Sequence, residues 1–397
     1  MDTSYWRTVS LVTLWQISAS ICYYTVFAAT PFFRDEFGLS GFEVGLVVTT
    51  LTLGYAVFLL PLGAITDRFG ERRTLSLGLI GLAAGTLLVA GAPTYALLLA
   101  AVFLLGSVYS TAMPGTNKAV YDSIAPGRQN MAMGIKQVGV TGGSGISALL
   151  VTGLAGVFFW QAGFLIATGV AVVVAIGFSL LYEGSGGGTT SYPDLRGLAD
   201  NRPYVLLATS GLFSGAALFT TTGYTVLYVE ESIGSSVAFG GVVLALVQLF
   251  GSGGRLVGGW LADRLPGDPQ TRIGGILLVQ TLASAAMFVV VTTTSTPLGA
   301  GVAFSALGFF VLGFTGVYYS CMATLVPADE MGSATAGCQL TLTSGALLAP
   351  PAFGYLADTM SYRASWWLLA GVCLVAAGLV AAVIRSDPPV GETAMGE

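Results

Sequence analysis

Apolar runs of about 20 residues recur along the whole length of this chain, and that recurrence decides what the chain can fold into. A helix needs roughly 20 mostly apolar residues to cross about 30 Å of hydrocarbon. The composition agrees, because 9% of the residues are charged, whereas soluble proteins carry about 25%. A surface so poor in charge does not suit water. The sequence therefore predicts an integral membrane protein.

Twelve of these runs are separated by turn residues or by short charged stretches. Unpaired backbone groups are costly in hydrocarbon, so each run is expected to cross as an α-helix, and open sheets are excluded. The first run is too long and too polar for a cleaved signal peptide, and we expect it to be retained. The expected spans are 8–32, 43–66, 74–92, 95–119, 130–155, 158–182, 203–229, 240–262, 273–293, 298–325, 331–357 and 364–385.

The distribution of Lys and Arg between the loops predicts how these spans are oriented. With the N-terminus in the cytoplasm, eleven basic residues fall on the cytoplasmic side and two, Arg34 and Arg363, on the outer side. This asymmetry predicts a multi-pass protein of the cell membrane with both termini in the cytoplasm. It also supports twelve spans, because a missed span would invert the later loops. The cytoplasmic basic residues are Arg7, Arg68, Arg72, Arg73, Lys118, Arg128, Arg196, Arg202, Arg264, Arg272 and Arg385.

Two internal similarities, each between segments nearly half the chain apart, indicate a duplication. "GAITDRFG" at 63–70 is similar to "GGWLADRLPG" at 258–267, and each places Asp-Arg at the cytoplasmic end of a span. Glycine-rich helices with a Gln near that same end occur at 134–145 and 337–351. The sequence thus predicts an all-α polytopic membrane protein with twelve transmembrane helices in two pseudo-symmetric six-helix bundles.

A long polar connection separates the sixth and seventh spans, and its Gly, Ser and Pro content is typical of a linker. We therefore expect an N-terminal six-helix bundle at 1–182 and a cytoplasmic linker at 183–202. The remainder, 203–397, is expected to form the C-terminal six-helix bundle with a short cytoplasmic tail.

The stretch "GAITDRFGERR" at 63–73 concentrates charge directly after the second span. It resembles the motif that the major facilitator superfamily carries in this loop, and a weaker copy follows the eighth span. The resemblance covers the whole chain and implies a transporter whose loop is a latch between the halves, with Asp67 facing the positive end of span eleven. Glu71 departs from the motif, which usually has a cation there. The residues expected in this gating motif are Gly63, Asp67, Arg68, Gly70, Arg72, Arg73, Gly259, Asp263 and Arg264.

Charge well inside the spans is confined to two basic residues, Lys136 in the fifth span and Arg255 in the eighth. No Asp or Glu lies well inside a span, and the chain has no His. A cation in the membrane costs about 2.5–3.5 kcal/mol on insertion scales, and a substrate anion would offset that cost. Carboxylates and His are the usual proton-coupling groups, so the sequence favours antiport or uniport over proton symport.

Helical spacing places Arg255 and Gln248 on one face, because they lie seven residues apart. The position of this Arg ahead of "GGWLADR" resembles anion carriers of the superfamily, including oxalate:formate antiporters and nitrate/nitrite porters. We expect Arg255 and Lys136 to be charge partners of a small anion that Tyr and Gln side chains orient. The further candidates for the substrate site are Gln137, Gln248, Gln16, Tyr23, Tyr24, Tyr109, Asn117, Tyr224, Tyr318 and Gln339.

These features predict an alternating-access transporter, secondary active or facilitative, for a small organic or inorganic anion. The alternative is an exporter of neutral or hydrophobic compounds, in which Lys136 and Arg255 are structural. An enzyme is not expected, because the spans offer no metal-ligand cluster, carboxylate pair or His-containing triad. Apart from its substrate and the lipid bilayer, no cofactor, metal or nucleic acid is expected. One chain is expected to function as a monomer.

Overall fold

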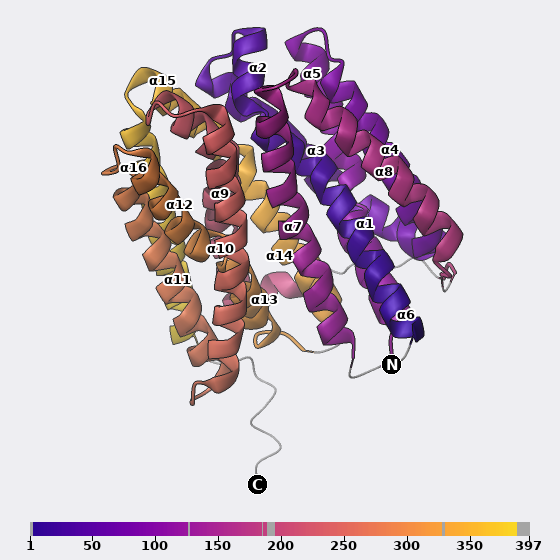
Figure 1. The fold of residues 1–397 in the computed structure, drawn as a ribbon. Helices are drawn as coiled ribbons and strands as arrows, with labels where there is room; N and C mark the ends of the chain where they lie inside the picture. The colour runs from indigo at the N-terminus through magenta and orange to yellow at the C-terminus, as the bar shows by residue number, and fades with distance from the viewer. Residues whose placement is uncertain (1–2, 126–127, 185, 189–194, 328–329, 387–397) are drawn as a thin grey trace.

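The computed structural model describes residues 3–125, 128–184, 186–188, 195–327 and 330–386, and these residues form α-helices and two short 3₁₀ helices, with no strand among them (Figure 1). The expected C-terminal tail beyond 386 and the part of the expected linker at 189–194 lie outside the described residues. Eleven helical spans are long and apolar enough to cross a membrane. The all-α polytopic fold is thereby confirmed.

The first half of the chain contributes one bundle. In it α1 packs on α7, α3 on α5, and α4 on α8. The short α2 lies at the end of the molecule away from both termini (Figure 1). The bounds are α1 Thr3–Ala28, α2 Thr30–Phe37, α3 Gly41–Phe69, α4 Glu71–Ala90, α5 Tyr95–Tyr109, α6 Ala112–Ser123, α7 Gln129–Ala155 and α8 Gln161–Leu181.

The second half forms a bundle in which α9 packs on α14 and α16, α10 on α12, and α11 on α16. The two bundles meet along two helix pairs, α7 with α10 and α3 with α15. The bounds are η1 Gly197–Asp200, α9 Arg202–Glu231, α10 Val237–Arg264, α11 Pro269–Val291, α12 Pro297–Val311, α13 Phe314–Ala323, α14 Met331–Ser344, η2 Gly345–Leu347, α15 Ala349–Thr359 and α16 Tyr362–Arg385.

Polar residues just ahead of the apolar runs begin several of these helices. At the start of α3, the Ser40 hydroxyl accepts a hydrogen bond from the Glu43 amide, and the Glu43 carboxylate accepts one from the Ser40 amide. This reciprocal arrangement satisfies two backbone donors that a helix end leaves free. At the start of α9, Asn201 accepts from the Tyr204 amide and donates to the Leu325 carbonyl. The cap thus also ties α9 to the end of α13.

Three spans that the sequence predicts as single helices are interrupted. The span expected at 95–119 breaks between α5 and α6, and that at 298–325 breaks between α12 and α13. The span expected at 331–357 is divided into α14, η2 and α15 and is missing from the eleven candidate spans, two of which, Tyr95–Ser123 and Pro297–Ala323, run across the other two breaks. Proline is one cause, because Pro114, Pro350 and Pro351 lack the amide donor that an uninterrupted helix needs. The expectation of continuous helices was wrong at these places.

The face away from the termini, termed the opposite face, is closed by contacts between the bundles. The Arg34 guanidinium pairs with Glu231 and Asp358, each at 3.2 Å. Burial would lower the pKa of Arg34, yet these two carboxylates and Tyr362 raise it above its ordinary value. At the same face, the Tyr224 hydroxyl of the second bundle donates a hydrogen bond of 2.6 Å to the Gly41 carbonyl oxygen of the first. The opposite face is therefore sealed by both charge and backbone contacts.

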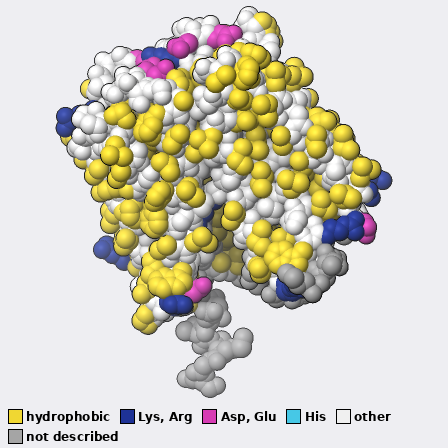
Figure 2. Space-filling view, in the orientation of Figure 1, with side chains coloured by type: hydrophobic (Ala, Val, Ile, Leu, Met, Phe, Trp, Pro, Cys, Tyr) yellow, Lys and Arg dark blue, Asp and Glu magenta, His cyan; other side chains and the backbone are white. Residues whose placement is uncertain are grey.

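The face at which the described chain begins, at Thr3, and ends, at Ser386, is termed the terminal face, and it is open between the bundles. A vestibule of about 400 Å³ lies there, and Figure 2 shows the hollow between the two bundles at this end. Both bundles contribute to its wall. The residues that line the vestibule are Leu59, Leu60, Gly63, Ala64, Asp67, Met113, Pro114, Asn117, Gly332, Ser333, Thr335, Ala336 and Gln339. The molecule is thus open at one face and closed at the other.

Close helix packing predicts which glycines cannot be enlarged. A Cβ at Gly106 would overlap the carbonyl oxygen of Leu51, whereas a Cβ at Gly177 meets nothing within 4 Å. Gly106→Ala is expected to lower the free energy of unfolding by about 1–3 kcal/mol, and Gly177→Ala to leave it unchanged or slightly raised. Thermal unfolding of both variants in detergent checks this. Equal stability of the two variants would contradict the packing at the α3–α5 crossing.

The ion pairs of the opposite face predict how its closure can be weakened. Arg34→Gln leaves Glu231 and Asp358 without their cation and is expected to favour opening of this face by about 1–2 kcal/mol. The measurement is labelling of Phe27→Cys by an impermeant maleimide, because Phe27 is fully buried and stacks on Phe219 of the other bundle. The labelling rate should rise several-fold. Arg363→Gln, an exposed Arg that contacts Trp367, is the control and should leave the rate unchanged.

Candidate functional site

A cavity of about 150 Å³ lies between the bundles, next to the vestibule. Met113 of α6 and Gln339 of α14 line both spaces, so these two side chains lie between the cavity and the vestibule of the terminal face. Its wall is mostly aromatic and polar. The lining residues are Gln16, Tyr23, Tyr24, Tyr55, Tyr109, Ala112, Met113, Lys136, Gln137, Val140, Thr141, Leu218, Phe219, Thr222, Gln248, Arg255, Leu312, Thr315, Tyr319, Gln339 and Leu342.

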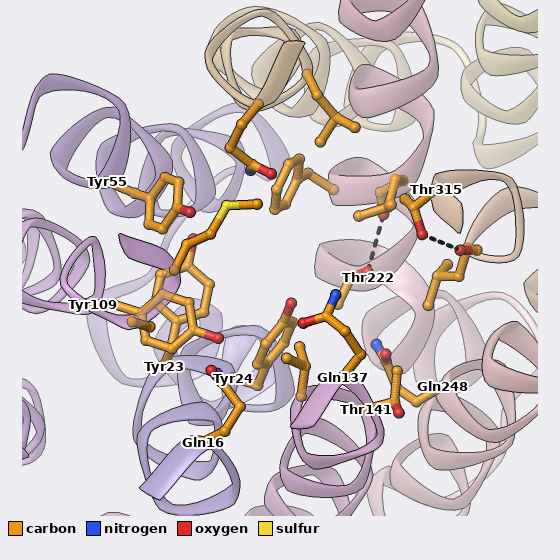
Figure 3. A pocket seen from close by; sticks show the side chains of 18 of the residues that line it. Gln16, Tyr23, Tyr24, Tyr55, Tyr109, Gln137, Thr141, Thr222, Gln248 and Thr315 are labelled. Carbon is orange, nitrogen blue, oxygen red and sulfur yellow. Dashed lines mark hydrogen bonds between the residues drawn. The ribbon is translucent and has the colours of Figure 1, made fainter. Parts of the chain in front are cut away.

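Tyrosines of the first bundle form one side of the cavity. Tyr23 and Tyr109 stack with ring centroids 4.1 Å apart, and the Tyr55 ring lies 5.9 Å from that of Tyr109. Figure 3 shows these rings gathered on one side, with Thr222 and other polar residues across from them. Stacking fixes the rings while their hydroxyls remain available for hydrogen bonds.

A chain of hydrogen bonds links four side chains on the side of the cavity that the tyrosines form. Thr116 donates to Gln16 Oε1, Gln16 Nε2 donates to the Ser20 hydroxyl, and that hydroxyl lies 3.1 Å from the Tyr109 hydroxyl. All four side chains are buried. Because each group fixes the next, the Gln16 amide and the Tyr109 hydroxyl have defined orientations in the cavity wall.

Arg255 is placed by a close crossing of α10 with the break between α12 and α13. A Cβ at Gly254 would overlap the Phe309 carbonyl, and one at Gly313 would also meet Gly254. This crossing brings the Arg255 Nε to 3.2 Å from the Leu312 carbonyl oxygen, at the end of α12. The guanidinium therefore has one neutral protein acceptor and donors left over for a ligand.

Lys136 of α7 lines the same cavity and is 2% exposed. Its ammonium donates to Asn117 Oδ1 at 2.5 Å. Among the described residues, neither Lys136 nor Arg255 takes part in an ion pair. Two cations thus face one cavity with neutral partners.

The second bundle adds further hydrogen-bonding groups. The Tyr319 hydroxyl donates to Gln339 Oε1, and Gln339 Nε2 donates to the Thr343 hydroxyl. Gln248 is 3% exposed, and its Nε2 has no hydrogen-bond partner within the described part of the chain. No Asp or Glu is among the residues that line this cavity. The wall therefore presents an excess of donors over acceptors, which suits a ligand with several acceptor oxygens.

Nine of the twelve residues predicted for the substrate site lie in this cavity wall. Asn117 lies in the vestibule wall and contacts the cavity through Lys136. Tyr224 lies at the sealed opposite face, and Tyr318 is buried beside Gly211 of α9. The nine are Arg255, Lys136, Gln137, Gln248, Gln16, Tyr23, Tyr24, Tyr109 and Gln339.

Sequence reasoning missed several lining residues. Tyr319, and not the expected Tyr318, lines the cavity. The sequence does not show which side of α13 faces the cavity, because this ten-residue helix follows a break. Tyr55 carried a weak signal, as a single Tyr inside an apolar span. Met113, Thr222 and Thr315 carried none, since such residues are common throughout these helices.

Residues of the predicted gating motif lie at the terminal face. Gly63 and Asp67 line the vestibule, together with Gly332 and Ser333 at the start of α14. Gly70 has φ +84°, a conformation that favours glycine, between α3 and α4.

The rest of the motif contacts its own bundle or the solvent. Arg72 donates to the Ser179 carbonyl, Arg68 lies over the Phe69 ring, and Arg264 lies over the Trp260 ring. Arg73 and Asp263 are exposed, and Gly259 has open space around it. No hydrogen bond or ion pair joins the motif residues to the other bundle within the described ranges.

The segment after α8 runs along the motif. The Gly188 amide donates to the Asp67 carbonyl at 2.7 Å, and a Cβ at Gly187 would overlap the Arg68 carbonyl. Glu71, which departs from the motif, is fully buried and accepts a hydrogen bond from the Tyr182 hydroxyl. The segment that follows α8 therefore holds the motif loop in place.

Curated relatives of similar length are transporters. The hexuronate transporter of Bacillus subtilis (strain 168) is 25% identical over 91% of this chain and 90% of its own. The probable L-galactonate transporter of Escherichia coli (strain K12) is 22% identical over 90% and 84%. The probable sulfoacetate transporter SauU of Cupriavidus necator is 24% identical over 91% and 90%.

Solved structures share the fold. A bacterial homologue of the human lysosomal transporter Spinster, in an inward-facing and occupied conformation, superposes with a TM-score of 0.83 at 15% identity, covering 98% of both chains. The nucleoside transporter NupG superposes with a TM-score of 0.76 at 14% identity over 95% of this chain and 98% of its own. The profile of the Major Facilitator Superfamily matches residues 12–337. The chain therefore belongs to the Major Facilitator Superfamily and is a multi-pass membrane transporter.

Proposed function

We propose that this transporter carries a small organic anion by alternating access, with the cavity between the bundles as its binding site. The observation that carries the proposal is the pair of cations in the cavity wall, Arg255 and Lys136, which lack an ion-pair partner among the described residues. A cation held inside a membrane protein is costly. A bound anion supplies the charge that the protein does not.

The other lining groups support an anion with several oxygens. Arg255 has free donors beyond the one on the Leu312 carbonyl, and the Gln248 Nε2 donor has no partner. The tyrosine hydroxyls and Gln137 add adaptable groups on the other sides. A hydroxylated carboxylate matches this set, with its carboxylate at Arg255 and its hydroxyls at the amides and phenols.

The volume of the cavity and the compounds for which the relatives are named also favour a small organic acid. A cavity of about 150 Å³ is of the size that holds benzene, so it suits a small ligand. The relatives are named for hexuronate, L-galactonate and sulfoacetate, which are small organic acids. We extend this class to the present chain and select hexuronates as the first compounds to test.

The terminal face is proposed to lie in the cytoplasm, because the loops there carry most of the basic residues. The structure then represents an inward-open state, and Arg34 with its two carboxylates is the closed outer gate. Asp67 and the start of α14 line the same vestibule from opposite bundles. In the outward-open state the vestibule closes, and Asp67 then approaches the positive end of α14. One chain holds the entire cavity, which supports function as a monomer.

Removal of the Arg255 charge tests this proposal. Arg255→Gln in proteoliposomes is expected to lower glucuronate uptake and binding by about 30-fold or more, because the carboxylate loses its charge-assisted hydrogen bonds. The measurements are uptake of labelled glucuronate and its stabilisation of the purified protein against heat. Arg363→Gln, far from the cavity, is the matched control and should bind normally.

The alternative, an exporter of neutral or hydrophobic compounds, gives the reverse result. Transport would survive Arg255→Gln and fail when the stacked rings are trimmed, for example in Tyr109→Leu. That outcome, or absence of stabilisation by any small organic or inorganic anion, would contradict the anion proposal.

A further inference from the structure

A groove of about 550 Å³ lies between the start of α9 and the end of α16, at the terminal face. The other ends of these two helices meet at the opposite face, where the Tyr362 hydroxyl donates to the Glu231 carboxylate. The groove shares no residue with the central cavity or the vestibule. Its lining residues are Arg202, Pro203, Leu206, Gly378, Ala381, Ala382, Arg385 and Ser386.

Small residues on one side of α16 form the apolar part of the groove. Gly378, Ala381 and Ala382 lie on one helix face, and Arg385 follows on the same face. A Cβ at Gly378 would meet nothing within 4 Å, so the space beside it is open. Leu374, one turn further into the membrane, is 56% exposed. The groove therefore runs about 10 Å from Arg385 to Gly378 and continues into the lipid-facing surface of α16.

Two arginines stand at the end of the groove nearest the terminal face. Arg202 and Arg385 are both exposed, and neither takes part in an ion pair within the described ranges. Arg385 lies in the last turn of α16, where the helix dipole favours a cation. Arg202 is the first residue of α9, where the dipole disfavours a cation and favours an anion. A bound anion would stabilise both arginines.

Hydrogen bonds from side chains fix the backbone that carries each arginine. Asn201, which caps α9, also donates to the Leu325 carbonyl. Gln270 of α11 donates to the carbonyls of Val383 and Ser386, at the end of α16. Both helix ends are thus held to other parts of the second bundle, so the two arginines lie at a preformed groove.

We propose that this groove binds an anionic phospholipid of the surrounding leaflet. The phosphate lies between Arg202 and Arg385, and an acyl chain lies along Gly378, Ala381 and Ala382. Basic pockets between transmembrane helices recognise anionic lipid headgroups in this way. The apolar part of the groove favours a lipid over a soluble phosphate. All lining residues belong to the second bundle, so the site does not depend on the proposed substrate and is expected to persist in both states of the transporter.

The test measures lipid binding to the delipidated full chain in detergent by native mass spectrometry. The probes are dioleoylphosphatidylglycerol and, as the zwitterionic comparison, dioleoylphosphatidylcholine. The unaltered protein is expected to bind the anionic lipid about tenfold more tightly. Combining Arg202→Gln with Arg385→Gln should weaken binding of phosphatidylglycerol by about thirtyfold, since each basic residue contributes about fivefold.

A second variant tests the groove without changing its charge. Gly378→Phe fills the apolar part and is expected to weaken phosphatidylglycerol binding by about fivefold or more, because the acyl chain loses its place. Gly371→Phe is the matched control, since Gly371 lies two turns earlier on α16, also has open space beside it and does not line the groove. Its affinity for phosphatidylglycerol should be unchanged.

A matched double variant distinguishes a site from general attraction. Arg73→Gln with Arg264→Gln removes the same charge from the same face, and neither residue lines the groove. Its phosphatidylglycerol binding should equal that of the unaltered protein. An equal loss in both double variants would overturn the proposal, because it would reflect the net charge of the face alone.

Other occupants of the groove give different results. Soluble glycerol 3-phosphate that binds as tightly as phosphatidylglycerol would overturn the lipid assignment in favour of a free phosphate. A change of oligomeric state in Gly378→Phe on gel filtration, with phosphatidylglycerol binding unaltered, would overturn it in favour of a second copy of the chain. If the Arg202 and Arg385 variant does not fold, the comparison of Gly378→Phe with Gly371→Phe still decides the inference.

Discussion

The candidate binding site depends on one electrostatic constraint. Two basic side chains, Lys136 and Arg255, line a membrane-embedded cavity, and no carboxylate lines that cavity with them. Two other basic residues of the described chain show the opposite arrangement. Arg34 is paired with two carboxylates and Lys118 with one. We propose that the paired cations are structural and that the two cations of the cavity bind the substrate.

Helix packing holds Arg255 in place, and a hydrogen bond to Asn117 holds Lys136. The crossing of Gly254 with Gly313 brings the α10 backbone against the end of α12, and this puts the Arg255 guanidinium at the carbonyl of a broken helix. The break also lets Tyr319 point into the cavity and orient Gln339. The break between α12 and α13 thus supplies polar groups to the cavity wall. Non-helical backbone at membrane depth is tolerated where it lines such a cavity.

Much of this was readable from the sequence, because a bilayer imposes simple rules. The apolar runs gave the membrane fold and nearly all spans, and the absence of acidic residues inside them identified Arg255 and Lys136 as unusual. Helix breaks were not readable, since Pro350 and Pro351 can also lie inside a kinked span and the 312–313 break has no proline. The phase of a helix is lost at each break, which is why Tyr319 was missed in favour of its neighbour Tyr318. Tyr224 was expected in the cavity, but its hydroxyl contacts the Gly41 carbonyl of the other bundle and the Pro350 carbonyl of its own, at the sealed face.

The central claim is that the cavity cations share a bound anion. A structure of the protein solved with glucuronate tests it most directly. The account predicts the ligand carboxylate within hydrogen-bond distance of the Arg255 guanidinium, on the side of the cavity that Lys136 also faces. A ligand bound elsewhere, or one whose carboxylate points away from both cations while Arg255 keeps its single bond to the Leu312 carbonyl, would contradict it.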